Sequence, residues 1–431
     1  MGLPVRVNRY RCRVAEVLPF RALHYELASV GSLADVTAPP YDVIDEAERA
    51  GLMARSPFNV VELDLPVSPE VDGDPYARAA ELLEGWLLSG VLAQDREPTI
   101  WALTQDYTGP EGGKRRRNAI LARVRVTDYG PGQVRPHERT QPGPKQDRLD
   151  LTRATRYNLS PIFSLTTRDA WRHVEPVTAG APWAEVTDGD GTVHRLWPVS
   201  DPEVHDAVTG ELAGSELLIA DGHHRYETAR TYRDEIGGEG DHEFTLMALT
   251  GLDDPGLTVF PTHRLLTALD SDGLGRLREG LAGPFEVIEV ADGVDPDPAG
   301  LEATGCFGYV DRTGARCLLE LRDPGSLIDL MPDRSDAYRT LDAAILEKVV
   351  LEGMLEMTEA DVEAKKGIGY SKSIEDALDR VEIDEADAAF ILRATPVEQV
   401  RAVADAGETM PPKSTYFFPK LLSGMAFNPL S

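Results

Sequence analysis

The residues that most constrain the fold are Glu216–Glu235, which are predicted to form a strand, a tight turn and a helix in direct succession. An apolar run ends at the pair Asp221-Gly222, which marks a turn. Helix-forming residues follow the pair, with Ala229 and Tyr232 spaced to face inward. We therefore expect the rest of the chain to be organised around this corner, with the chemistry at its turn.

The turn carries residues that suit an anion site. Gly222 has no side chain, so its backbone can adopt a positive φ or let a ligand approach closely. The amides of His223, His224 and Arg225 are predicted to begin the helix, at the positive end of its dipole, where phosphate is favoured. Arg225 can contact two phosphate oxygens, Asp221 can hold Mg²⁺ or accept a proton, and the histidines can add donors or a base. The alternative is an ordinary strand-to-helix corner that Asp221 caps.

The turn also resembles known phosphate-binding motifs. Asp221–Arg225, which reads DGHHR, resembles the signature of the free-serine kinases of the ParB/sulfiredoxin superfamily, and this resemblance implies that the turn grips the phosphates of a nucleotide. Gly222, Arg225 and Ala229 also resemble the phosphate-binding box of ParB. His223 stands where the similar sulfiredoxin motif has its cysteine, so sulfiredoxin chemistry is not expected.

Over almost its full length, the chain is identified as a member of a bacterial and archaeal family known as domain of unknown function 1015. Besides the turn, the matching segments are Ala38–Ile44, Pro136–Thr140, Asn158–Phe163 and Lys413–Lys420. The likeness to the kinases, in contrast, is confined to the turn.

Length and pattern predict an α+β protein of mixed sheets and helices in two halves. The chain has 431 residues, which is too long for one small core. Residues 1–268 are predicted to form a half that carries the turn, with the ParB/sulfiredoxin-like nucleotide-binding core that the resemblance implies. Residues 269–431 are predicted to form a C-terminal α/β half that packs on it.

Charge and composition exclude several classes of protein. The formal net charge is −29, whereas nucleic-acid binding depends on clustered Lys and Arg, so no nucleic-acid partner is expected. No run of about 18 apolar residues is present, so no membrane span is expected. The N-terminus lacks the apolar core of a signal peptide, and Cys12, Cys306 and Cys317 have neither disulfide nor metal spacing. These features favour a cytoplasmic protein.

A second group of candidate residues lies near His137-Glu138. This pair follows a turn rich in Gly and Pro, so it is predicted to lie on a loop, where it can supply a general base that Arg139 or Lys145 positions. A surface loop of ion pairs is the alternative. Tyr41-Asp42 follows two prolines that fix an extended backbone, so it forms either a wall of the substrate pocket or a rigid turn.

Two further segments complete the set of candidates. His263-Arg264 lies in an extended piece, where His263 either lines the pocket or is a satisfied core histidine. Near the C-terminus, Lys413 and Lys420 can bind an anion, and Lys413 is preferred as the ligand. Phe417 and Phe418 are expected in an aromatic strand that closes the core.

The periodicity of the chain predicts its main elements. Strands are expected at 59–65, 99–107, 117–127, 160–166, 244–249, 306–310, 317–321 and 388–392, and helices at 76–89, 149–158, 202–212, 341–354 and 397–406. The basic run Lys114–Arg117 is expected at a solvated hairpin end.

The function predicted from these features is a small-molecule kinase that transfers phosphate from ATP or ADP, with Mg²⁺, to a hydroxyl of a metabolite. The resemblance implies free serine or a related metabolite as the substrate. The turn and Arg225 would hold phosphate, Asp221 would hold Mg²⁺ or orient the hydroxyl, Glu138 would act as the base, and Lys413 would neutralise the transferred charge. His224 is a further catalytic candidate.

Two alternatives remain open. One is a nucleotide-binding regulatory module without turnover. The other is a metal-dependent hydrolase that uses His137, Asp221, His223 and His224 as ligands.

Overall fold

The computed structural model describes residues 16–68, 73–110, 112–140, 142–291 and 293–430. Cys12 and the N-terminal residues considered for a signal peptide lie outside these ranges. Among the described residues, no helix combines the length and the apolar character needed to cross a membrane.

The chain forms two compact units. The first comprises Met1–Pro136, Thr140–Leu257 and Pro419–Ser431, and the second comprises His137–Arg139 and Thr258–Phe418. The division expected after residue 268 differs from these units in two ways. The main change of unit falls at Leu257, and the last residues of the chain return to the first unit.

The first unit is built on a mixed sheet, for which nine strands are found among the described residues, in the order β6-β11-β8-β12-β5-β4-β10-β9 with β1 beside β5. β11 runs parallel to β6 and β12 parallel to β8, and the other pairs of the sheet are antiparallel. The strands of this unit are β1 (Val17–Leu18), β2 (Leu23–Tyr25), β3 (Leu92–Gln94), β4 (Ile100–Thr108), β5 (Lys114–Arg125), β6 (Val134–Arg135), β7 (Tyr157–Asn158), β8 (Ile162–Thr166), β9 (Ala184–Thr187), β10 (Val193–Val199), β11 (Leu217–Asp221), β12 (Phe244–Gly251) and β21 (Asn428–Pro429).

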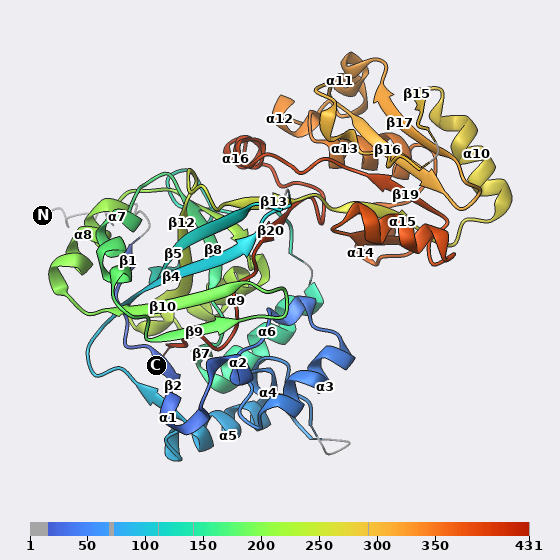
Figure 1. The fold of residues 1–431 in the computed structure, drawn as a ribbon. Helices are drawn as coiled ribbons and strands as arrows, with labels where there is room; N and C mark the ends of the chain where they lie inside the picture. Colours follow the sequence, from blue (N-terminus) through green and yellow to red (C-terminus); the bar gives the residue numbers. More distant parts are fainter. Residues whose placement is uncertain (1–15, 69–72, 111, 141, 292, 431) are drawn as a thin grey trace, which may run out of the picture. The chain divides into compact units, whose positions relative to one another are not determined.

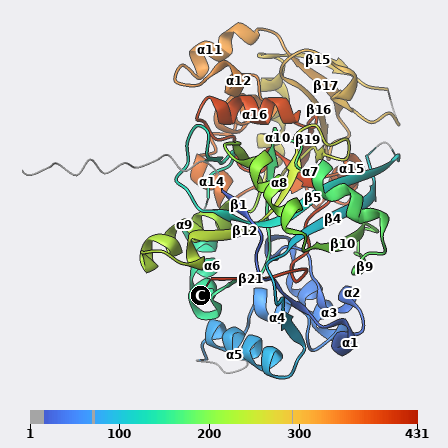
Figure 2. The same cartoon turned by 90° about the vertical axis from the view of Figure 1, so that its left-hand side faces the viewer.

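The first unit also contains nine α-helices among its described residues. They are α1 (Leu27–Val30), α2 (Leu33–Val36), α3 (Glu46–Arg55), α4 (Val61–Asp64), α5 (Pro75–Leu88), α6 (Pro142–Thr155), α7 (Trp171–Val174), α8 (Pro202–Leu212) and α9 (His223–Ile236), with 3₁₀ turns at Tyr41–Val43, Glu175–Ala179 and Asp241–Glu243. Tyr226 and Ala229 of α9 join Ile219 of β11 and Met247 of β12 in one buried cluster. α6 runs beside α9 (Figure 1, Figure 2), so the motif helix is supported by both a sheet and a helix.

The second unit is built on an antiparallel sheet in the order β15-β17-β16-β19-β14-β18. Its strands are β13 (Thr258–Phe260), β14 (His263–Leu266), β15 (Phe285–Glu289), β16 (Cys306–Asp311), β17 (Arg316–Leu321), β18 (Ile368–Ser371), β19 (Ala388–Ile391) and β20 (Tyr416–Phe418). Its helices are α10 (Ser271–Leu281), α11 (Leu327–Leu330), α12 (Asp336–Arg339), α13 (Asp342–Leu346), α14 (Glu359–Glu363), α15 (Ile374–Glu382) and α16 (Val397–Asp405), with 3₁₀ turns at Pro298–Gly300 and Pro324–Ser326 and a π-helix, η6, at Glu347–Glu352. Ala377 and Val381 of α15 pack on this sheet.

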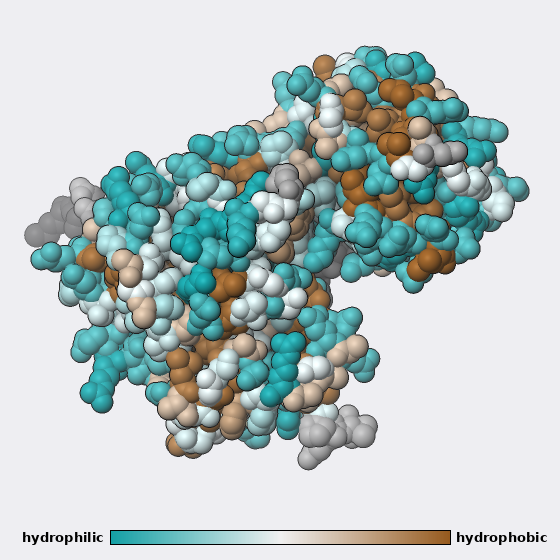
Figure 3. Space-filling model, viewed as in Figure 1, coloured by the Kyte–Doolittle hydropathy of each residue, from teal (hydrophilic) through white to brown (hydrophobic). Residues whose placement is uncertain are grey.

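The predicted α+β class is confirmed. The large sheet of the first unit is mixed, whereas that of the second unit is antiparallel. On the face drawn in Figure 3, hydrophilic residues predominate, in keeping with the net charge of −29. The expected strand over 59–65 is wrong, because this segment contains the helix α4. The loop expected before residue 149 is also too long, because α6 already begins at Pro142.

Candidate functional site

The predicted strand, turn and helix are present at Asp221–His223. β11 ends at Asp221, Gly222 has a left-handed backbone with φ 93° and ψ 31°, and α9 begins at His223 without a side-chain cap. The first helical hydrogen bond runs from the amide of Tyr226 to the carbonyl of Gly222. A Cβ at position 222 would lie 2.9 Å from Nε of Arg225. The left-handed backbone conformation therefore favours glycine there.

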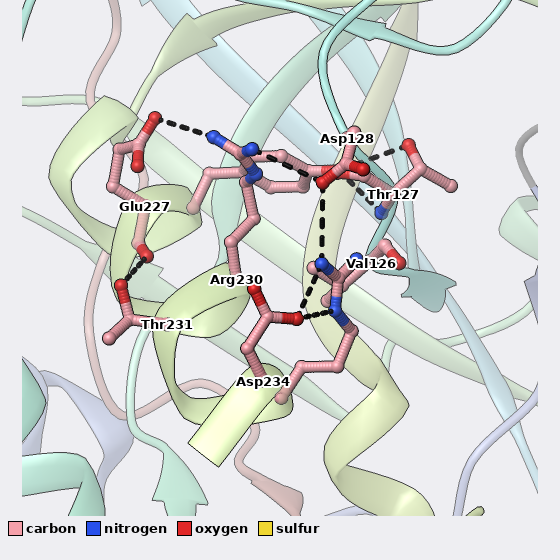
Figure 4. A network of polar contacts seen from close by, with 9 residues as sticks. Val126, Thr127, Asp128, Glu227, Arg230, Thr231 and Asp234 are labelled. Atoms are coloured by element: carbon pink, nitrogen blue, oxygen red, sulfur yellow. Dashed lines mark hydrogen bonds and ion pairs between the residues drawn. The ribbon is translucent and has the colours of Figure 1, made fainter. Parts of the chain in front are cut away.

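The axis of α9 is fixed by polar contacts with the residues that follow β5 (Figure 4). Oη of Tyr226 donates to the carbonyl of Thr127 and accepts from its amide, both at 3.0 Å. Arg230 contacts Glu227 at 3.1 Å and Asp128 at 3.2 Å. These contacts hold the helix from its second turn onward, so they also fix the position of the turn at its N-terminus.

Two cations converge on the carboxylate of Asp221. Nη2 of Arg225 donates to Oδ2 at 2.8 Å, and Nζ of Lys420 donates to Oδ1. The three side chains are between 11% and 18% exposed. Burial acts to raise the pKa of Asp221, but Lys420 and Arg225 hold it well below the usual range. The carboxylate is therefore charged at neutral pH, and two cations against one anion leave the turn with one net positive charge.

Arg225 also binds the segment that precedes β8. Nη1 donates to the carbonyl of Pro161 and to Oγ of Ser160, the latter at 3.3 Å. Nε, in contrast, is buried and has no hydrogen-bond acceptor among the described residues. Buried nitrogens of other arginines, such as Arg78 and Arg123, share this property, so it does not by itself mark a ligand site.

Tyr41 lies close to the turn, whereas Asp42 beside it is exposed. The guanidinium of Arg148 lies 4.1 Å from the ring centre of Tyr41, and its Nη1 donates to Oδ1 of Asp64 at 2.8 Å. Burial, aided by Asp42 and opposed by Arg148 and Arg225, raises the pKa of Tyr41 above its usual range. A cavity of about 40 Å³ is lined by Asp64, Arg148 and Arg225, among others. It has room for about one water molecule.

Lys420 is held in place by two buried side chains, Gln105 and Arg117, which we call the tail clamp. Nε2 of Gln105 donates to the carbonyl of Lys420 at 2.9 Å, and Nη2 of Arg117 donates to the carbonyl of Pro419. Nε of Arg117 donates to Oε1 of Gln105 at 2.9 Å. Both side chains are fully buried, and burial lowers the pKa of Arg117 to about 10. Arg117 is therefore still charged at neutral pH.

The tail clamp is continued by His194 and Asp188. Nδ1 of His194 lies 3.2 Å from Nε2 of Gln105, and Nε2 of His194 lies 2.8 Å from Oδ2 of Asp188. Gln105 can donate to Nδ1 only if the histidine proton is on Nε2, from which it donates to Asp188. The network thus runs from the tail across β4 and β10.

The variant Gln105→Ala is expected to lower the free energy of unfolding by about 3 kcal/mol, because it removes the buried partners of Arg117, Lys420 and His194. Urea denaturation measures this loss. Gln94→Ala, at an exposed glutamine, should change the unfolding free energy by less than about 0.5 kcal/mol. An unchanged Gln105→Ala protein would contradict the role of the tail clamp.

The second group of predicted residues lies in the second unit. His137 is buried, and its Nε2 lies 3.0 Å from Oγ1 of Thr415. Glu138 forms an isolated parallel bridge with Met410. Lys413 is exposed and has a positive φ of 57°. The segment 410–415, which precedes β20, therefore lies beside His137-Glu138.

Arg264 is the buried cation of this second group. It donates to the carbonyl of Pro412 at 3.3 Å, and its guanidinium lies 5.1 Å from the ring centre of Tyr370. Burial lowers the pKa of Arg264, whereas Tyr370, Glu347 and Glu138 raise it. Burial, followed by the charge of Arg264, also lowers the pKa of His263 to about 4, so this histidine is neutral at pH 7.

The structure thus divides the predicted site residues into two groups, one in each compact unit. Tyr41, Asp42, Asp221, Gly222, His223, His224 and Arg225 belong to the first unit, and His137, Glu138, His263, Arg264 and Lys413 belong to the second. The roles given to them in catalysis and binding stay predictions.

From the sequence alone, Lys413 is the preferred anion ligand instead of Lys420, and neither Gln105 nor Arg117 is identified as a site residue. Lys420 was marked only by its place in the matching segment Lys413–Lys420. Nothing in the local sequence distinguishes Gln105 from other strand residues, and Arg117 was expected at a solvated end. The described residues contain no group of three His, Cys, Asp or Glu side chains that could hold a metal ion.

Comparisons with known proteins give a family match along most of the chain. The family described as "Protein of unknown function (DUF1015)" matches residues 17–344. No curated protein matches the chain.

Solved structures give weaker likenesses. A free serine kinase variant in complex with ADP has a TM-score of 0.38 and 14% identity, over 69% of this chain and 88% of that chain. A conserved hypothetical protein from Pyrococcus furiosus has a TM-score of 0.35 and 17% identity, over 67% of this chain and 88% of that chain. SbnI with a C-terminal truncation, from Staphylococcus aureus, has a TM-score of 0.35 and 11% identity, over 70% and 85%. TM-scores this low carry no argument about the chemistry of this chain.

Proposed function

The chain belongs to the DUF1015 family, and from the geometry of its turn we propose that it is a small-molecule kinase that transfers phosphate from ATP or ADP to a hydroxyl group of a metabolite. The observation that carries the proposal is the set of donors at Asp221–Arg225. Arg225 and Lys420 outnumber the one carboxylate that lies between them.

A nucleotide phosphate would satisfy these groups. α9 begins without a side-chain cap, so the positive end of its dipole is directed at the turn. Because Gly222 has no Cβ, the guanidinium of Arg225 lies close to the backbone of the turn, where it would meet the phosphate. Lys420 supplies a charge from the tail, and Arg225 supplies a second one from the first turn of the helix. In this proposal the terminal phosphates of the nucleotide lie at Gly222–Arg225.

Mg²⁺ enters the proposal with the nucleotide rather than through a site built by the protein alone. Both oxygens of Asp221 are already paired with cations, and a single carboxylate holds Mg²⁺ only together with phosphate oxygens and water. When bound, the ion would offset the charge of the phosphates. We assign Asp221 first to holding Arg225 and Lys420 in place, and only second to the metal.

The transfer requires a hydroxyl oxygen that attacks the terminal phosphorus. A new P–O bond forms, the bridging P–O bond to the nucleotide breaks, and a base takes the hydroxyl proton. Glu138, the base that sequence analysis proposed, belongs to the second unit, and His224 at the turn is the other candidate. Free serine is the first substrate to test, because the turn resembles that of the free-serine kinases.

The two alternatives differ in their support. A nucleotide-binding module without turnover would use the same phosphate site, so only an activity measurement separates it from a kinase. The metal-dependent hydrolase has less support, because the described residues contain no group of three His, Cys, Asp or Glu side chains that could hold a metal ion.

The test is a transfer assay followed by ³¹P NMR. The protein is incubated with ATP or ADP, Mg²⁺ and serine, and then with other small hydroxylated metabolites in turn. The proposal expects a new phosphomonoester with the wild-type protein and none with Lys420→Met. Nucleotide binding without any ester would favour the regulatory module, and the absence of binding would overturn both nucleotide hypotheses.

A further inference from the structure

A second cavity lies in the second unit, where α13 continues into the π-helix η6. Its volume is about 230 Å³, and its wall includes Met331, Tyr338, Glu347 and Met410. That volume corresponds to about eight liquid water molecules. π-helical turns are rare and occur frequently at functional sites. Since the whole wall belongs to one compact unit, the cavity is a feature of that unit alone.

The basic side chains on this wall are already neutralised. The pairs are Arg139 with Glu359 at 2.5 Å, Lys348 with Glu352 at 2.5 Å and Arg334 with Glu408 at 3.7 Å. An anionic ligand would have to compete with these carboxylates. The cavity therefore offers little to an anion.

Glu347 differs from these paired carboxylates. It is partly buried at the start of η6, and its carboxylate has no ion-pair or hydrogen-bond partner among the described residues. Burial, with Glu352 and Glu359 adding to it and Arg264 and Arg139 opposing it, raises the pKa of Glu347 to about 7. A carboxylate that is withdrawn from water and unpaired favours either a proton or a cation.

We propose that this cavity binds a small organic cation with a primary ammonium group, for which Glu347 is the counter-ion. The ammonium group supplies the three donors that Glu347 lacks. Met331 and Met410, both buried on the wall, supply adaptable apolar surface for the alkyl part of the ligand. Tyr338 lies on the same wall, with the guanidinium of Arg334 at 4.4 Å from its ring centre. This site is independent of the phosphate site at Asp221–Arg225.

The proposal is tested by calorimetric titration at pH 8 with propylammonium chloride and 1,4-diaminobutane, and with 1-propanol as a neutral probe of similar size. We expect both amines to bind at least tenfold more tightly than the alcohol. Between pH 8 and pH 6 the charged fraction of Glu347 falls about tenfold, so the affinity for the amines should fall by the same factor. Equal binding of amine and alcohol, or no binding of any probe, would overturn the proposal.

Glu347→Gln identifies the residue responsible. It keeps the shape of the side chain and should lower the affinity for propylammonium at least tenfold, with loss of the pH dependence. Glu375→Gln, at an exposed glutamate of α15, should bind like the wild type. Undiminished binding by Glu347→Gln would contradict the assignment. If that variant fails to fold, the comparison of amine with alcohol and the pH profile of the wild type decide the question.

Discussion

Asp221→Asn is expected to lower the free energy of unfolding by about 2–4 kcal/mol at neutral pH. The substitution keeps the shape of the side chain but leaves Arg225 and Lys420 without their shared anion. Breaking a fully buried ion pair in this way costs about 3–5 kcal/mol, and the partial exposure of this one reduces the loss. Urea denaturation at pH 7 measures the effect. Asp206→Asn, at an exposed aspartate for which no ion pair is found in the described part of the chain, should leave stability unchanged within about 0.5 kcal/mol.

The dependence of this loss on pH follows from the direction of the pKa shift. The pKa of Asp221 is lower in the folded protein than in the unfolded chain. Its contribution to stability is therefore fully present above the unfolded value of about 3.9 and disappears as the pH falls from there through the folded value. The wild type and Asp221→Asn should become alike in strong acid, provided both remain folded. Equal stability of the two proteins at pH 7 would contradict the ion-pair account.

Lys420→Met is expected to weaken ADP binding about 100-fold, which corresponds to roughly 3 kcal/mol. The variant removes the ammonium charge at the proposed phosphate position. Of the two cations that contact Asp221, only Arg225 then remains, so the turn loses its net positive charge. Hydrogen bonds to charged groups contribute about 1.5–3 kcal/mol. Calorimetric titration with ADP measures the loss.

Two other lysine variants test whether the loss of ADP affinity is specific to Lys420. Lys372→Met, at an exposed lysine of the second unit, should bind ADP like the wild type. Lys413→Met tests the role that sequence analysis gave to Lys413. If Lys413→Met lost ADP affinity and Lys420→Met did not, the assignment of the phosphate site to the turn would be wrong.

The helices and strands that depend on a local sequence pattern could be predicted from the sequence. The pair Asp221-Gly222 between an apolar run and a helix-forming run predicted β11 and α9, and the inward spacing of Ala229 and Tyr232 is confirmed by their burial. The strands expected at 99–107, 117–127, 306–310 and 317–321 are likewise present, as β4, β5, β16 and β17. In each case the residues that decide the structure are close together in the sequence.

Asn59 shows how a local pattern can mislead. Its apolar successors suggested a strand, but its side chain donates to the carbonyls of Asp35 and Thr37 and accepts from the amide of Val61 at 3.0 Å. These contacts turn the chain into the helix α4. A contact across 24 residues thus outweighed the preference of a short apolar run.

The site itself depends on contacts that are still more distant. Arg117 binds the carbonyl of Pro419, 302 residues later, and Gln105 binds that of Lys420, 315 residues later. Neither the burial of Arg117 nor the return of the tail to the first unit is encoded in a nearby pattern. For this reason the turn could be predicted from the sequence, whereas Lys413 was predicted as the anion ligand instead of Lys420.

The central claim is that phosphate is bound at Gly222–Arg225, and the most direct measurement is a calorimetric titration of the wild-type protein with ADP and with adenosine, each with and without Mg²⁺. The account predicts micromolar binding of ADP and at least 100-fold weaker binding of adenosine, because the phosphates supply the anion that the turn requires. Equal affinity for the two compounds, or no binding of ADP under any of these conditions, would contradict it.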